Sequence, residues 1–148
     1  MAERMCEKDT ESVYAFLYKD RAPFASARLC GEGENAGVCG GVSFYETPLG
    51  VLVRAELCGL KKQVLRKKRA YNFCVRDERT KECLSKDNRS LCTAMPTAYE
   101  KDGCFECVLV TRRISPSDLV GKKVVVYECS RGCPKSISDA VAYGRIES

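Results

Sequence analysis

The sequence contains no histidine among its 148 residues. Imidazole is the commonest metal-ligating side chain, so any metal held by this chain needs other donors. Long apolar runs are also lacking, and a run such as 124–126 (Val-Val-Val) is far too short to span a bilayer. Residues 1–10 are rich in charge and have no apolar core behind a basic start, so we expect no secretory signal and a cytoplasmic location.

The composition is that of an ordinary folded domain. Apolar residues make up 45% and charged residues 30% of the chain, and its length suits one domain that buries about two-thirds of its unfolded surface. The net charge of +5 includes a basic cluster between 61 and 69. That cluster has little aromatic interleaving and no recognisable binding motif, which favours a solvated loop. We therefore expect neither a nucleic-acid partner nor a membrane partner.

The periodicity of apolar residues predicts a short helix followed by an all-β domain. Residues 10–19 have apolar side chains at helical spacing, whereas the chain after Pro23 alternates between apolar and polar residues. Closely spaced strands joined by Gly- and Pro-containing turns are typical of a sandwich or barrel. We predict a helix and linker over 1–24 and a β-sandwich domain over 25–148. Within that domain the pattern indicates strands near 27–30, 38–45, 53–58, 71–75, 105–111, 122–128 and 140–146, with a long loop over 76–103.

Several short motifs occur in an order that suggests a family. They lie at 27–31, 41–47, 50–57, 59–60, 71–75, 102–103, 111–114, 118–128 and 140–146, and the longest reads Asp-Leu-Val-Gly-Lys-Lys-Val-Val-Val-Tyr-Glu. In order and spacing they resemble the copper/zinc superoxide dismutases, in particular the small bacterial branch. The resemblance implies a Greek-key antiparallel β-sandwich, and it makes a homodimer or larger assembly possible, because members of the family often dimerise.

The same resemblance implies that the family's metal site has been lost. The positions of the copper-binding His-x-His pair are Cys74 and Arg76, and a further copper histidine is replaced by Tyr127. Three more family positions have changed as well: the zinc aspartate, the arginine that guides superoxide and the cysteine of the terminal strand correspond to Ala94, Ala140 and Tyr143. An arginine has no lone pair to donate, and a thiolate favours Cu(I) over Cu(II). The resemblance therefore implies a non-catalytic dismutase-like protein with a structural or association role, and we expect no cofactor.

Eleven cysteines in this chain form a second feature with two interpretations. Cytosolic thiols are normally reduced and act as small hydrophobes or surface groups, whereas clustered thiols can bind metal or be oxidised. Hairpin arithmetic places Cys30 opposite Cys39 and Cys39 opposite Cys58, all pointing away from the core. Such a row could hold Zn(II) or Cu(I), form one disulfide, or consist of three independent surface thiols. The alternative function is thus a cysteine-based metal-binding or thiol redox-buffering protein.

The remaining cysteines allow weaker predictions. Cys129 and Cys133 share a predicted loop, where chelation or a local disulfide is geometrically easy. Cys104 and Cys107 form a Cys-x-x-Cys motif, but on a strand these positions point to opposite faces and could chelate an ion only if a turn extends into Cys104. Cys74 is expected to be a buried, inert thiol in the former metal pocket.

Overall fold

The computed structural model describes residues 17–18, 20–60, 71–77, 82–83, 92–94, 105–112, 114–128 and 140–148. These residues contain nine strands in one sheet, and every recorded strand pair is antiparallel. The predicted all-β class is therefore confirmed. The strands are β1 (Ala25–Cys30), β2 (Cys39–Thr47), β3 (Gly50–Cys58), β4 (Tyr71–Asp77), β5 (Glu82–Cys83), β6 (Cys92–Ala94), β7 (Phe105–Thr111), β8 (Lys123–Glu128) and β9 (Ala142–Glu147).

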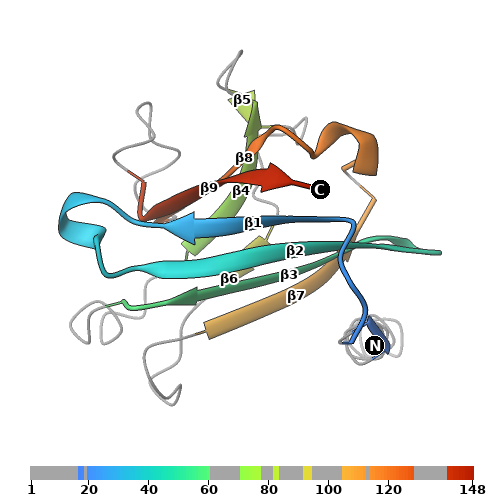
Figure 1. Ribbon diagram of the computed structural model, residues 1–148, viewed down its shortest axis with the longest axis horizontal. Coiled ribbons are helices and arrows are strands. Elements are labelled where there is room, and N and C mark those ends of the chain that lie inside the picture. Colours follow the sequence, from blue (N-terminus) through green and yellow to red (C-terminus); the bar gives the residue numbers. More distant parts are fainter. Residues whose placement is uncertain are drawn as a thin grey trace, which may run out of the picture.

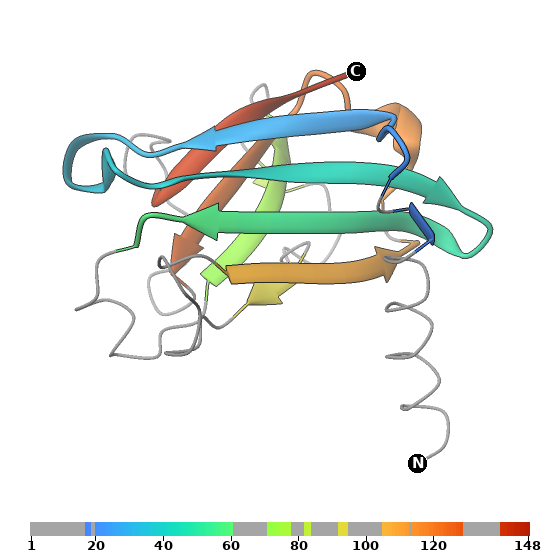
Figure 2. The same cartoon turned by 60° about the horizontal axis from the view of Figure 1, so that its bottom comes forward.

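The order of strands across the sheet differs from their order in the chain. It runs β5-β4-β8-β9-β1-β2-β3-β7, and β6 pairs with β4 beside β5. The sheet curls, so that β1, β2, β3 and β7 form a front layer while β4, β6 and β8 cross behind it (Figures 1 and 2). The last strand, β9, lies between β8 and β1 and joins the two layers.

The main core fills the inside of this curl. Alternate residues of β1 are buried and exposed, as expected for a strand with one face on the core. Leu29, Phe44, Phe73 and Val124 are all 0% exposed and come from four strands in both layers. By contrast, β8 is buried along both faces, because a second and smaller cluster covers its outer side.

Turn geometry sets the registers of the first three strands. Gly50 has a φ of +138°, and the Thr47 hydroxyl donates a hydrogen bond to its carbonyl oxygen at 2.8 Å, which closes the β2–β3 hairpin. At the other end of the hairpin, Gly59 has a φ of +84°, and a Cβ there would lie 2.1 Å from the Gly37 carbonyl oxygen. Only glycine fits such a position without displacing the backbone.

The structure is compared with the predicted elements at two irregular segments, 76–103 and 10–19. Within the predicted loop over 76–103, β5 and β6 both pair with β4, so this segment contributes to the sheet. Of the predicted helix over 10–19, Leu17 and Tyr18 are helical and the rest lies outside the described residues. The Tyr18 ring packs edge-on against Tyr45 with centroids 5.8 Å apart. Among the described residues, no helix has the length and apolar character needed to cross a bilayer.

Candidate functional site: a cross-strand row of cysteine and tyrosine

Six in-register residues form a continuous row across six strands. Backbone pairing places Cys74 opposite Val125, Val125 opposite Tyr143, and Tyr143 opposite Cys30. Cys30 in turn lies opposite Cys39, and Cys39 opposite Cys58. Directly opposed residues of antiparallel strands project from the same face, so all six point away from the main core. We call this set the cross-strand row.

One end of the row is a closed cluster that contains two of the positions the predicted resemblance assigns to copper ligands. Cys74 is 0% and Tyr127 is 7% exposed, and the Cys74 sulfur lies 3.3 Å from the Tyr127 hydroxyl oxygen. Val125 and Ala140 complete the buried cluster, and the ring of Tyr143 packs against it. The predicted burial of Cys74 is confirmed. We call these five residues the outer cluster.

The other positions that the predicted resemblance assigns to the metal site lie nearby in the sheet. Arg76 lies two residues beyond Cys74, on the same face of β4, and is 2% exposed. Ala94 lies on β6, where its backbone pairs with Tyr71. The structure thus brings together Cys74, Tyr127 and Ala140, while Ala94 belongs to a separate strand.

These residues do not fit a copper/zinc site. Two of the positions assigned to imidazoles by the predicted resemblance hold a thiol and a phenol in mutual contact, and the guanidinium of Arg76 has no lone pair with which to bind a metal. The whole chain offers no histidine to substitute for them. No reaction step through a copper ion can therefore be assigned to this cluster.

The middle of the row is an interaction that the sequence did not reveal. The Tyr143 hydroxyl donates a hydrogen bond to Oε1 of Glu32, and the Lys123 ammonium lies 5.8 Å from the centroid of the Tyr143 ring. This hydrogen bond to the Glu32 carboxylate raises the pKa of Tyr143 above its ordinary value of 10.0. The Tyr143 side chain thus ties β9 to the turn after β1.

The other end of the row contains the three cysteines placed by hairpin arithmetic. Both predicted pairings, Cys30 with Cys39 and Cys39 with Cys58, are confirmed. Cys30 and Cys39 are free, exposed thiols. Cys58, in contrast, is disulfide-bonded, and its sulfur lies 3.3 Å from the Glu56 carboxylate. A disulfide sulfur has no proton, so this last contact is a packing contact.

The oxidation of Cys58 bears on the possible metal site of three thiolates. A disulfide sulfur is not the thiolate that binds zinc or Cu(I), so only two of the three predicted ligands remain. The described part of the chain also holds no group of three or more His, Cys, Asp or Glu side chains arranged for a metal ion. Cys129 and Cys133, the other predicted ligands, lie outside the described residues.

Cys107 is, like Cys58, an oxidised cysteine. It is disulfide-bonded and packs against the main core, whereas Cys104 lies outside the described residues. The interpretation in which every cysteine is a reduced thiol therefore does not hold, because Cys58 and Cys107 are oxidised. Disulfides persist mainly in oxidising compartments. The cytoplasmic location stays a prediction.

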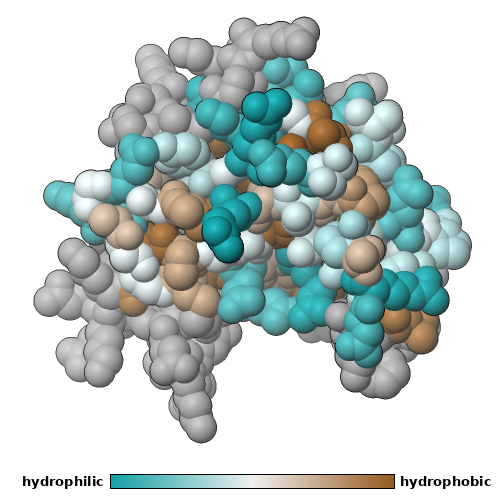
Figure 3. Space-filling view, in the orientation of Figure 1, coloured by the Kyte–Doolittle hydropathy of each residue, from teal (hydrophilic) through white to brown (hydrophobic). Residues whose placement is uncertain are grey.

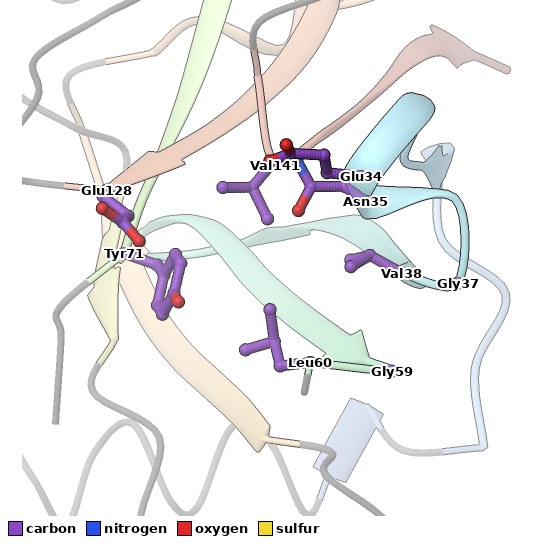
Figure 4. A pocket seen from close by; sticks show the side chains of 9 residues that line it. All are labelled: Glu34, Asn35, Gly37, Val38, Gly59, Leu60, Tyr71, Glu128 and Val141. Atoms are coloured by element: carbon purple, nitrogen blue, oxygen red, sulfur yellow. The ribbon is translucent and has the colours of Figure 1, made fainter. Parts of the chain in front are cut away.

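A pocket at one end of the curled sheet is a further feature that the sequence did not indicate. It has a volume of about 170 Å³. The side chains of Tyr71 and Glu128 face it from one side, with Asn35 and Val141 across from them (Figure 4). Glu128 is only 9% exposed. The nine residues that line this pocket include two carboxylates, Glu34 and Glu128, and the phenol of Tyr71, but no lysine or arginine.

Comparison with known proteins finds no family model and no curated protein whose sequence matches this chain. The resemblance to the copper/zinc superoxide dismutases therefore remains a prediction from the motifs.

Proposed function

We propose that this chain is a copper/zinc superoxide dismutase-like Greek-key sandwich that has lost its metal site and acts as a non-catalytic structural or association protein. One observation carries the proposal. The two positions assigned to copper ligands, Cys74 and Tyr127, are in contact with each other and buried among apolar side chains. A site built for superoxide needs an open ligand position, whereas this arrangement is a small hydrophobic core.

The strand order supports the dismutase-like part of the proposal. The chain leaves the β1–β2–β3 meander, crosses to β4 in the other layer, and finally returns as β9 beside β1. Long connections that return a late strand beside an early one are characteristic of Greek-key sandwiches. The positions that the resemblance assigns to copper ligands lie on β4 and β8, which are neighbouring strands.

Association is supported more weakly, by the surface. The face shown in Figure 3 has small groups of apolar residues between polar ones. Three large hydrophobic side chains among the described residues are exposed, namely Leu17, Leu49 and Val120. A homodimer or larger assembly stays part of the proposal.

A histidine-restoration experiment tests the proposed site. The native chain, mixed with Cu(II) and freed of excess by gel filtration, should show no dismutase activity and no Cu(II) electron paramagnetic resonance signal with nitrogen hyperfine coupling. The triple variant C74H/R76H/Y127H should acquire such a signal, because its imidazoles would converge on one face of β4 and β8. If the triple variant does not fold, the pair C74H/Y127H tests the same convergence.

The matched control places three histidines at scattered exposed positions, R28H/E46H/D118H. This control should bind Cu(II) without the coupled signal of a multi-histidine site. Dismutase activity in the native chain would contradict the loss of function. A folded C74H/R76H/Y127H protein with no more coupling than the control would contradict the assignment of these positions.

A second candidate function, thiol redox chemistry, is favoured by the other end of the row. Two free thiols lie beside an oxidised cysteine in the same ladder. The metal-binding form of this candidate keeps only the two thiols of Cys30 and Cys39, which could take Zn(II) or Cu(I) together with other donors.

A further inference from the structure

We propose that Cys30, Cys39 and the disulfide of Cys58 form an internal thiol–disulfide exchange relay. This inference rests on the thiol redox candidate, and it is independent of the dismutase-like assignment. Its basis is the coexistence, on three adjacent strands, of a free thiol, a second free thiol and a disulfide sulfur in one register.

The backbone geometry places Cys30 and Cys39 favourably for a bond. The Gly31 amide donates a hydrogen bond to the Val38 carbonyl oxygen at 3.0 Å. In an antiparallel ladder this bond makes the adjoining pair, Cys30 and Cys39, a non-hydrogen-bonded pair, whose Cα atoms are about 4.5 Å apart. Cα separations of about 4.4 to 6.8 Å are those of ordinary disulfides. The two strands can therefore be bridged with little backbone movement.

The step from Cys39 to Cys58 has a slightly wider geometry. The amide and the carbonyl of a strand residue point to the same side of the strand. Because Cys39 forms a non-hydrogen-bonded pair with Cys30 on β1, its amide and carbonyl point the other way, toward β3. Cys39 and Cys58 are therefore a hydrogen-bonded pair. Their Cα atoms should be about 5.5 Å apart, still within the range of a disulfide. Gly41, the next outward-facing residue of β2, has no side chain to obstruct the sulfur of Cys39.

The exchange balances without any added oxidant. In the first step the Cys39 thiolate attacks the Cys58 sulfur, a Cys39–Cys58 bond forms, and the former partner sulfur of Cys58 leaves as a thiolate. In the second step the Cys30 thiolate attacks the Cys39 sulfur, and Cys58 leaves as a thiolate. The protons of the two original thiols pass through solvent to the two released sulfurs. One disulfide is broken, one is formed, and the relay moves the oxidised state from Cys58 to the Cys30–Cys39 pair.

Exposure makes this pair the point of contact with other thiols. Cys30 and Cys39 are both exposed, whereas Cys74 is fully buried. Thiolate attack requires access to the sulfur. The substrate class of the relay is therefore an exposed thiol or disulfide of another protein or of a small molecule, which would exchange with Cys30 and Cys39 at the surface.

Disulfide mapping over time tests the relay. The full chain, purified without reductant, is held without oxygen at about pH 8, where a typical thiol is partly ionised, then acid-quenched, alkylated and digested for mass spectrometry. We expect peptides linked through Cys30 and Cys39 to appear over minutes to hours as the original Cys58 linkage declines by the same amount. C39S should retain the original linkage. C30S should stop at a Cys39–Cys58 linkage, and the matched control C74S, which removes a buried thiol, should behave as the native chain.

Two results would overturn the relay. One is an unchanged Cys58 linkage in the native chain after a day under these conditions. The other is formation of the Cys30–Cys39 bond at the native rate in C58S, because another oxidant would then be responsible. Serine at the exposed positions Cys30 and Cys39 should leave the fold unchanged. C58S removes a disulfide and C74S alters a buried position, so circular dichroism must first show that both variants are folded.

Discussion

Val125 offers the sharpest test of whether the outer cluster is a packed core. Its side chain is 0% exposed and lies at the centre of the outer cluster, between Cys74 on β4 and Tyr143 on β9. The neighbouring Val124 is equally buried but faces the main core. If the outer cluster is a true core, Val125→Ala and Val124→Ala should destabilise the protein by similar amounts.

The magnitude follows from the burial of two methyl groups. Each buried methylene-sized group contributes about 0.8 kcal/mol, so the lost transfer free energy is about 1.6 kcal/mol. The cavity left behind adds to this loss, for a total of about 2 to 3 kcal/mol. For a domain of this size the corresponding decrease in Tm is roughly 4 to 10 °C. Val120→Ala, at a side chain that is 48% exposed, should change stability by less than about 0.5 kcal/mol.

Urea unfolding under non-reducing conditions, followed by far-ultraviolet circular dichroism, measures these differences. Circular dichroism is suitable because the chain has no tryptophan to report unfolding by fluorescence. Equal denaturant slopes for the three variants would show that the change lies in folded-state stability. A cost for Val125→Ala as small as that for Val120→Ala would refute the packed cluster, because it would mean that the region is open to water.

Three further predictions concern the row and its turns. A double-mutant cycle of Cys74→Ala and Tyr127→Phe, measured by urea unfolding, should give a coupling of about 0.5 to 1 kcal/mol, and additivity would contradict their contact. The hydrogen bond to a carboxylate raises the pKa of Tyr143, so the folded state holds this proton more tightly than the unfolded state. Its contribution is therefore complete below about pH 10 and is lost as the pH rises through the raised pKa. Urea titrations of thiol-blocked protein should thus show that, at alkaline pH, the free energy of unfolding falls more steeply with pH for the native chain than for Tyr143→Phe. The same pH dependence in both proteins would contradict a contribution from the Tyr143 hydrogen bond. Gly59→Ala should cost about 2 to 4 kcal/mol in thermal unfolding, against about 1 for Gly33→Ala, because both have positive φ but only Gly59 faces a backbone oxygen. Equal losses of stability for the two variants would contradict this prediction, because they would show that the backbone shifts to remove the contact between the new Cβ at position 59 and the Gly37 carbonyl oxygen.

The sequence predicted the first three strands and their mutual register well, for a local reason. Alternating apolar residues identify each strand, and short turns with glycine and proline leave few ways to pair neighbouring strands. The pairings of Cys30 with Cys39 and of Cys39 with Cys58 depend only on these turns. The same reasoning could not find β5 and β6, because two- and three-residue strands have no periodicity and form only where β4 provides an edge.

The oxidation states within the row depended on contacts distant in the chain. Cys30, Cys39 and Cys58 look equivalent in the sequence, since all three are outward-facing cysteines near the ends of strands. Whether a thiol becomes a disulfide depends on which other sulfur the fold brings within about 2 Å of it, and that distance is a property of the assembled sheet. The hydrogen bond between Tyr143 and Glu32 likewise requires β9 to lie beside β1, 111 residues apart in the chain.

The absence of histidine by itself means that these 148 residues supply no imidazole to any site, because that conclusion depends only on composition. The sequence also determined the all-β class and the outward row of cysteines, since period-two alternation and turn chemistry act between near neighbours. Only the tertiary structure decided what surrounds Cys74 and Tyr127. The side chains of Cys74 and Tyr127 meet and are buried because β4 and β8 pair in one register and Ala140 packs against them. Burial of this kind arises from long-range packing, which no local pattern in the sequence encodes.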